Sequence, residues 1–505
     1  MESATKMNGK QSEVPEFMRA KWKTFREEYI KGAEPEFVFI VAVMLIVLCS
    51  HAYSDFYATW RHGITFWTAL FDGHPLQFYE YCKIGGPGNA WGNSLYFGNA
   101  KCAYDFTIYG VFAIWNLPIW LIEKIFHVNA QEVLPCIIWA KLLMAVALLI
   151  SAKYMLRICE QLYGGAVSRQ RALLVYLSSV LFYIYTIATG NYDILGLAVM
   201  LWGISCYFEG HNKRFILAFA LAFSMKFFGI LIFIPLVLLR EKRVLIIIRN
   251  VLLCLSVSVI EKILFTTGKV DNIGDTAGGS FVDLIEEVTV AGSVEGLGIG
   301  TVSLMFIGYA GVAIYCYMQI DRGEMCDRRK AIYMCLVSWA LFFLLQRINS
   351  YWIIIIVPFM VLVLLGSRHK KMSYMLEGMF SLAMLFRLML MQGGVLSGTT
   401  TFGMLPFQLF TVPLLGGKQF SGYMIGQILE RVNEILPIEV YLSSVCVVCM
   451  VAFLYINRPS DKGSVDESAA REGIFVRNRL WINLAVAIST TVLYCAEVVL
   501  KFIVG

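Results

Sequence analysis

The stretch RFILAFALAFSMKFFGILIFIPLVLLR, Arg214–Arg240, decides how this chain meets a membrane. Its 27 residues are apolar apart from the basic ends, Ser224 and Lys226. At about 1.5 Å per helical residue they are too few to cross a hydrocarbon core of about 30 Å twice. Basic residues mark the cytoplasmic side of a membrane protein, and they stand at both ends. The stretch therefore predicts two half-length helices that turn near Lys226. The turn would hold the Lys226 ammonium within the membrane thickness, open to the outer side.

The chain as a whole is also rich in apolar residues. Of its 505 residues, 58% are hydrophobic and 15% are charged, and apolar runs of 17 or more residues recur along its length. Such runs are long enough to span a bilayer, and helices satisfy their own backbone there. We therefore expect an all-α fold, a polytopic transmembrane helical bundle with about 11–13 membrane segments. The composition excludes a soluble protein.

Thirteen long apolar segments can be placed by hydropathy. They are residues 37–53, 104–122, 135–156, 172–189, 191–208, 214–240, 244–266, 298–319, 331–346, 351–366, 372–392, 438–456 and 480–502.

Charge sorts the connecting loops by side. One set of loops, together with the N-terminus, holds 28 Lys and Arg, and the other set holds seven. The positive-inside rule makes the first set cytoplasmic. We expect a multi-pass protein of the cell membrane with residues 1–36 in the cytoplasm, the active site on the extracytoplasmic side and an outside C-terminus. Residues 104–122 have outer loops at both ends, so either they are re-entrant or loop 123–134 lies on the other side. The net charge of +6 reflects these basic loops and implies no nucleic-acid partner.

The first outer loop, residues 54–103, opens with a distinctive motif. The stretch SHAYSDFYATWRHGITFW, residues 50–67, spaces its aromatic rings broadly along one helical face. This pattern is typical of an amphipathic helix lying in the membrane interface. Arg61 and His62 would then lie at headgroup height, where a cation suits a lipid phosphate. Asp55 beside them suits removal of a proton from a hydroxyl group, although an aspartate here can also simply cap the helix.

Further ionisable or polar residues gather at the outer ends of the predicted segments. Such groups are costly in a membrane and are candidate functional residues. We expect Asp105, Asp193, Lys226, Arg347 and Arg387 to face the outer half of one bundle together with Asp55. The residues expected to bind substrate are Asp105, Asp193, Lys226, Arg347 and Tyr351, whereas Arg387 is expected to be structural.

Several of these residues have simpler explanations. Asp193 can cap the helix that it begins, and Lys226 or Arg347 can extend to the headgroups. His62 lacks a partner pattern for a metal. The acidic loop 267–297 is expected to be a solvated loop, and we expect no metal ion and no cofactor.

Most of the cysteine residues are expected to pack in the protein interior and to have no chemical role. Most of them lie inside apolar runs, where a thiol acts as a small hydrophobic group. This includes the CVVC pair at Cys446 and Cys449. Cys82 and Cys102 share the first outer loop, and the sequence leaves their pairing open.

Three stretches resemble one enzyme superfamily. TGNYDILGLAVMLWGI (residues 189–204), the Lys226 half-helix pair and RINSYWIIIIVPFMVLVL (residues 347–364) are similar to motifs of GT-C glycosyltransferases. The likeness is greatest to the bacterial mannosyltransferase-like branch that depends on polyprenyl-phosphate sugars. It covers residues 37–366 as a GT-C-like catalytic module and leaves 367–505 as a C-terminal transmembrane module.

The resemblance implies roles for three residues. Asp55 corresponds to the catalytic acidic residue of the first outer loop, and Lys226 and Arg347 become candidates for the donor phosphate. The implied function is transfer of mannose or another hexose, with inversion, from a polyprenyl-phosphate sugar to an extracytoplasmic glycan, lipid or polymer. Membrane lipids are the other expected partners.

Two other functions remain open. The first is a transporter or flippase of a lipid-linked or amphiphilic substrate, which also uses broken helices. The chain shows no convincing inverted repeat, which favours the enzyme. The second is an accessory membrane subunit with a degenerate site.

Overall fold

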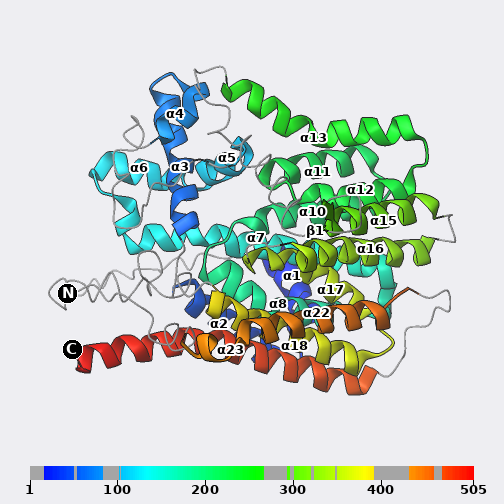
Figure 1. Ribbon diagram of the computed structural model, residues 1–505. Coiled ribbons are helices and arrows are strands. Elements are labelled where there is room, and N and C mark those ends of the chain that lie inside the picture. The colour runs from blue at the N-terminus through cyan, green and yellow to red at the C-terminus, as the bar shows by residue number, and fades with distance from the viewer. Residues whose placement is uncertain are drawn as a thin grey trace, which may run out of the picture.

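The structure is a computed structural model (Figure 1), and nearly all of its described chain is helical. It describes residues 16–49, 54–83, 102, 104–266, 293–295, 301–319, 324–346, 350–391, 431–459 and 469–504.

The first half of the described chain contains most of the short and broken helices. Its α-helices are α1 (Glu16–Phe25), α2 (Glu34–Leu48), α3 (Ser54–Phe71), α4 (Phe78–Cys82), α5 (Phe106–Trp115), α6 (Leu117–Phe126), α7 (Leu134–Tyr163), α8 (Arg169–Leu177), α9 (Val180–Phe182), α10 (Asp193–Phe208), α11 (Asn212–Met225), α12 (Gly229–Arg240) and α13 (Val244–Thr266). Between them lie the π-helices η1 (Arg26–Ile30) and η5 (Tyr183–Ala188) and the 3-10 turns η2 (Pro75–Gln77), η3 (Ala130–Glu132) and η4 (Gly164–Ala166).

The second half of the described chain completes the bundle. Its helices are α15 (Leu304–Met318), α16 (Glu324–Leu345), the 3-10 helix η7 (Ser350–Ile356), α17 (Val357–Leu365), α18 (Lys370–Met391), α22 (Ile438–Ile456) and α23 (Ala469–Val504). A short antiparallel ribbon pairs β1 (Ser293–Glu295) with β2 (Thr301–Ser303).

The predicted all-α membrane bundle is confirmed, and all thirteen predicted segments contain helix. By length and composition, three described helices are able to cross a membrane, or up to five if each bent pair counts as one span. The three begin at Leu134, Val244 and Ile438. Shorter apolar helices of 10–17 residues lie among them. The chain is therefore a multi-pass membrane protein.

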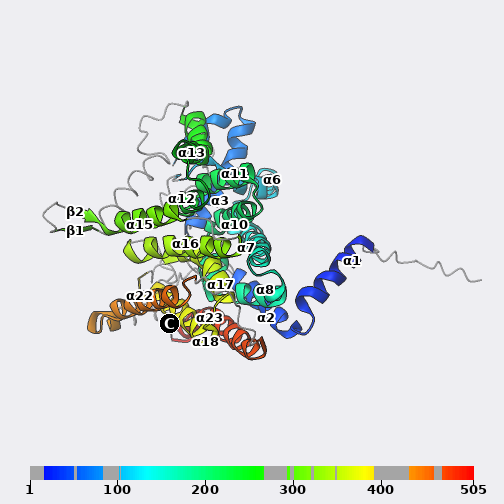
Figure 2. The same ribbon diagram turned by 90° about the vertical axis from the view of Figure 1, so that its right-hand side faces the viewer.

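The long helices lie side by side, and α3, α4, α5 and α6 gather at one end of this bundle (Figure 1). Figure 2, turned by 90°, shows α1 projecting to one side next to α2 and α8. The centre of the bundle is η7 and α17, whose residues from 353 to 362 are almost completely buried. A helix that is apolar on every side is typical of a protein core or of a membrane span, and the burial of these residues shows that this one lies in the core of the bundle.

The half-helix pair predicted near Lys226 is confirmed. α11 ends at Met225, Lys226 has an extended backbone, and α12 begins at Gly229. The start of α11 and the end of α12 lie next to each other, because Arg240 Nη1 donates a hydrogen bond of 2.6 Å to Asn212 Oδ1. Aromatic rings fill the space between the two helices, with Phe215 stacked on Phe233 at 5.0 Å. The pair is therefore a hairpin, not a single kinked span.

The segment predicted at 104–122 is also broken. α5 and α6 are bent by 63° at Asn116, whose side-chain amide donates to the Phe112 carbonyl. Pro118 stands in the first turn of α6, a position that tolerates its missing N–H. Both helices pack against α3 (Figure 1). They belong to the assembly at the end of the bundle.

A buried ion pair fastens the C-terminal helix. Arg479 on α23 donates to both carboxylate oxygens of Glu377 on α18, at 2.7 and 2.8 Å, and both side chains are almost fully buried. Arg479 also donates to the Val175 carbonyl and the Ser178 hydroxyl of the α8 segment. Three helices thus share one guanidinium group.

We expect Arg479→Met to lower the unfolding temperature in detergent, because it leaves the Glu377 carboxylate buried without its cation. Loss of one partner of a buried pair costs about 3–5 kcal/mol. The double variant Arg479→Met/Glu377→Met removes both charges and should recover part of this loss. Tryptophan fluorescence during heating measures both effects. A double variant no more stable than the single one would contradict the interpretation.

Candidate active site

Four separate segments bring charged or polar groups to one place. Asp55 lies in the first turn of α3, Asp193 is the first residue of α10, Lys226 separates α11 from α12, and Tyr351 lies in η7. These are four of the residues that the sequence predicts for substrate binding or catalysis. Their positions in the chain are up to 296 residues apart.

The pair of Lys226 and Asp193 forms the centre of this cluster. Lys226 Nζ lies 3.1 Å from Asp193 Oδ1, and both side chains are buried. The Asn191 side chain accepts a hydrogen bond of 2.9 Å from the Asp193 backbone N–H, which orders the start of α10. Asn191 therefore serves this helix end, and the Asp193 carboxylate is available to neutralise the lysine.

Aromatic rings enclose the Lys226 ammonium group. It lies 4.4 Å from the ring centre of Tyr104, 5.3 Å from that of Tyr192 and 5.6 Å from that of Trp352. The Tyr104 hydroxyl also lies 3.4 Å from Nζ. Cations bind favourably to such ring faces when water is excluded. The rings therefore help to keep a charged lysine inside the protein.

Asp55 occupies the more open side of the cluster and is half-buried. The Tyr351 hydroxyl donates to its Oδ2 over 3.5 Å, and Lys226 and Asp193 both lie within electrostatic range. Burial raises the pKa of the Asp55 carboxyl group, and the neighbouring Asp193 acts in the same direction. The Lys226 cation and the Tyr351 hydroxyl oppose this rise in pKa. A carboxylate with a raised pKa is a stronger base once it is ionised.

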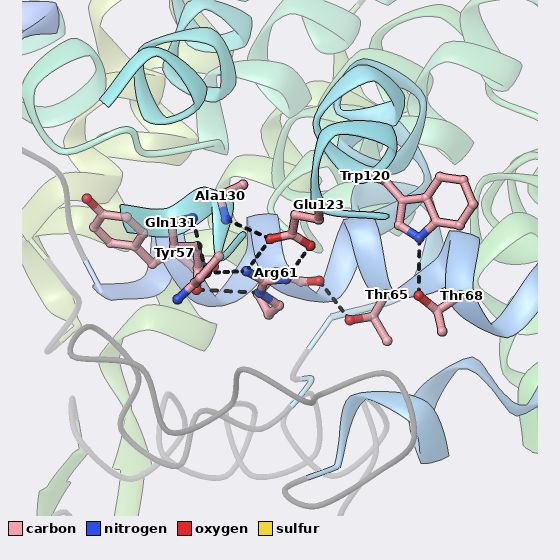
Figure 3. A network of polar contacts seen from close by, with 9 residues as sticks. Tyr57, Arg61, Thr65, Thr68, Trp120, Glu123, Ala130 and Gln131 are labelled. Atoms are coloured by element: carbon pink, nitrogen blue, oxygen red, sulfur yellow. Dashed lines mark hydrogen bonds and ion pairs between the residues drawn. The ribbon is translucent and has the colours of Figure 1, made fainter. Parts of the chain in front are cut away.

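Arg61 and His62 lie inside the protein. The predicted helix at the start of the first outer loop is present as α3, but residues 56–64 are buried. Arg61 forms an ion pair with Glu123 on α6 (Figure 3). The His62 ring packs edge-on against Tyr109 at 5.6 Å, and Cys102 lies within hydrogen-bonding reach of both His62 and Cys82. The expected exposure of Arg61 and His62 to lipid headgroups is wrong, because other segments of the protein cover this part of α3.

Asp105 lies beside the cluster and has its own partners. Ser258 on α13 donates to its Oδ2, and Lys262 Nζ lies 3.7 Å from Oδ1. Tyr104, the residue before Asp105, contacts Lys226. Asp105 with its two partners therefore adjoins the cluster around Lys226.

The cysteines of the CVVC pair in α22 are buried, as expected for packing. Arg347 and residues 267–292 of the acidic loop lie outside the described residues.

The sequence reasoning missed the aromatic enclosure of Lys226. These rings stand next to predicted site residues in the sequence. Tyr104 precedes Asp105, Tyr192 precedes Asp193, and Trp352 follows Tyr351. Among the described residues, no group of three or more His, Cys, Asp or Glu side chains is arranged to hold a metal ion.

Comparisons with known proteins give two similar solved structures. ArnT from Cupriavidus metallidurans bound to undecaprenyl phosphate has 13% identity and a TM-score of 0.43, over 92% of this chain and 76% of that one. Arabinosyltransferase EmbB from Mycobacterium smegmatis has 12% identity and a TM-score of 0.41, over 98% of this chain and 42% of that one. Both are GT-C glycosyltransferases, the superfamily that the sequence motifs resemble. At these TM-scores the likeness assigns no role to any residue.

No protein-family model matches the chain, and no curated protein matches its sequence.

Gly190 allows α3 to pack closely against the start of α10. Its φ of +75° is in the left-handed region that favours glycine, and an added Cβ would lie 2.8 Å from the Phe56 ring. Gly210 has a similar φ of +76° but open space around it. Substitution of Gly210 therefore tests the cost of backbone strain alone, and substitution of Gly190 tests strain together with the contact with Phe56.

We expect Gly210→Ala to cost only the left-handed backbone penalty of about 1–2 kcal/mol. Gly190→Ala should lower the unfolding temperature further, because the methyl group also displaces Phe56, the residue after Asp55. Heating curves of the two variants in detergent measure the difference. Equal losses would show that Phe56 moves aside without cost.

Proposed function

We propose that this protein is a membrane glycosyltransferase that uses a polyprenyl-phosphate sugar as its donor. The observation that supports this most is the meeting of Asp55, Asp193 and Lys226 in one cluster. A transferase of this class needs one carboxylate to accept a proton and a cation to stabilise a departing phosphate. The motifs that resemble GT-C enzymes contribute Asp193 and Lys226 directly.

Asp55 is the proposed general base. Its Oδ accepts the proton of the acceptor hydroxyl while the hydroxyl oxygen bonds to the anomeric carbon. The bond from that carbon to the phosphate oxygen breaks on the opposite face, and polyprenyl phosphate leaves with the bonding electrons. One displacement inverts the configuration of the sugar. The half-buried position of Asp55 suits a group that must meet the acceptor.

Lys226 is the proposed partner of the departing phosphate. Among its described contacts, Asp193 and the Tyr104 hydroxyl engage the ammonium group. The ammonium carries three N–H bonds, so one is left for a phosphate oxygen. A cation held in a site with little water stabilises developing negative charge more strongly than one in water. Asp193 would then orient Lys226, and Arg347 is retained as a second candidate for the phosphate.

The donor sugar, the acceptor and the side of the membrane are parts of this proposal. Mannose or another hexose is the expected sugar, and the acceptor is an extracytoplasmic glycan, lipid or polymer. The N-terminus is assigned to the cytoplasm from the basic residues of the loops. Tyr351 and Asp105 remain candidates for contacts with the sugars, since Tyr351 contacts Asp55 and Asp105 adjoins the cluster.

We expect Asp55→Asn to reduce sugar transfer at least about 100-fold, because loss of a general base typically costs about 10²–10⁴ in rate. Purified protein in liposomes, polyprenyl-phosphate mannose or glucose with a radiolabelled sugar, and a panel of octyl glycosides as acceptors provide the assay. Asp72→Asn is the matched control, since Asp72 is an exposed carboxylate just beyond the C-terminal end of α3.

Two outcomes would contradict the proposal. Undiminished transfer by Asp55→Asn would exclude Asp55 as the base. Absence of transfer from every such donor, combined with exchange of a lipid-linked sugar across the liposome membrane, would favour a transporter. The α11–α12 hairpin is the observation that keeps this second function in view, because transporters also place broken helices at their binding sites.

The pH dependence of transfer should depend on Lys226. Asp55 must be ionised to act as a base, so activity falls as the pH drops through its pKa. Lys226→Met removes the cation that lowers this pKa. The acid limb of kcat/KM should therefore move to higher pH, and Tyr351→Phe should move it in the same direction by less. An acid limb at the same pH in both variants would show that another group titrates.

A further inference from the structure

A network of hydrogen bonds holds α3 from the side that faces α6 (Figure 3). Arg61 Nη1 and Nη2 donate to the two carboxylate oxygens of Glu123 at 2.9 and 2.8 Å. Nη2 also donates to Asn129 Oδ1 at 2.9 Å, and Nε donates to Gln131 Oε1 at 3.4 Å. The Arg61 side chain is only 3% exposed. Its guanidinium group is therefore committed to the protein.

The partners of Arg61 also hold one another and the α3 backbone. The Ala130 N–H donates to Glu123 Oε1, and the Gln131 side-chain amide donates to the Tyr57 carbonyl, both at 2.9 Å. Two points on α3, at Tyr57 and Arg61, are thus tied to η3 and the end of α6. A planar guanidinium that binds a carboxylate through two bonds also constrains direction, not only distance. We call this network the Arg61 clamp.

Helix geometry links the clamp to Asp55. Residues four apart share a helix face, so Tyr57 and Arg61 lie on one face while Asp55 and Thr59 lie on another. Two residues of helix turn the chain by about 200°, which places these faces on nearly opposite sides. Asp55 reaches Tyr351, and Thr59 is within hydrogen-bonding reach of the Tyr192 hydroxyl. Any rotation of α3 that loosened the clamp would move Asp55 as well.

A buried ion pair is a costly way to hold a helix. Well-packed apolar residues often stabilise a fold as much or more, so stability alone does not account for such a pair. We propose that Arg61 is a positioning residue that sets the rotation of α3, and through it the place of Asp55 beside Lys226 and Tyr351. This inference rests on the proposed function and assigns Arg61 no contact with substrate.

The test compares two buried arginine–glutamate pairs. The double variant Arg61→Met/Glu123→Gln removes both charges of the clamp. We expect its kcat, per folded molecule, to fall roughly ten- to a hundredfold, because small displacements of a catalytic group have effects of this size. Its KM for the polyprenyl-phosphate sugar should stay unchanged. Arg61→Lys keeps the positive charge but cannot form the paired hydrogen bonds of a guanidinium group with Glu123. Its kcat should lie between those of the wild type and the double variant.

The matched control is Arg479→Met/Glu377→Gln, which removes a pair of the same kind from helices that hold none of the proposed site residues. It should lower the unfolding temperature and leave kcat per folded molecule at the wild-type value. A raised KM with unchanged kcat in the Arg61 variants would mean that Arg61 binds the donor and would overturn the proposal. A wild-type kcat in both Arg61 variants would overturn it too.

The same assay separates failure of this inference from failure of the proposed function. If wild type transfers no sugar, or if Asp55→Asn transfers it normally, the proposed function fails and the position of Asp55 has no role to explain. If Asp55→Asn is inactive while the Arg61 variants behave as wild type, only the positioning role fails.

Discussion

The need to bury one ammonium group constrains the centre of this protein. An isolated charge taken out of water is strongly destabilising, and an opposite charge at close range offsets much of that cost. Lys226 satisfies this condition through Asp193 at 3.1 Å and through the rings of Tyr104, Tyr192 and Trp352. These partners come from α10, η7 and the segment before α5. Placing Lys226 therefore fixes how segments far apart in the sequence meet.

The same arrangement gives the two carboxylates different properties. Asp193 is fully buried and adjoins the ammonium directly, so its charge is balanced. Asp55 is half-buried and shares the same cation from farther away, with Tyr351 as its hydrogen-bond partner. Pairs of acidic groups in unlike surroundings commonly divide the work of a site, one orienting and one reacting. The proposed division between Asp193 and Asp55 follows from their depth in the protein, although both are aspartates.

The sequence predicted most of the fold and part of this cluster. Length and charge at the two ends of residues 214–240 were enough to predict the α11–α12 hairpin, because both are local properties. Asp55, Asp193 and Lys226 are expected on one side of one bundle, and Tyr351 is expected to bind substrate. The structure brings these four residues together. Arg61 was expected at the headgroups, because the spacing of aromatic residues cannot reveal that Glu123, Asn129 and Gln131 cover the polar face. Those partners lie 62 to 70 residues later in the chain. Contacts of that range are set by packing, which a periodic pattern does not describe.

The hydrogen bond between Arg240 and Asn212 has a consequence for the number of membrane crossings. Because it joins the two feet of the α11–α12 hairpin, the chain enters and leaves this stretch at one level of the bundle. The stretch contributes no net crossing, although its hydropathy alone would count as one. A topology count that gave this stretch one crossing would therefore place residue 241 on the wrong side of the membrane relative to residue 211. The segments just before Asn212 and just after Arg240 therefore share a compartment, which a count based on hydropathy alone would divide between two.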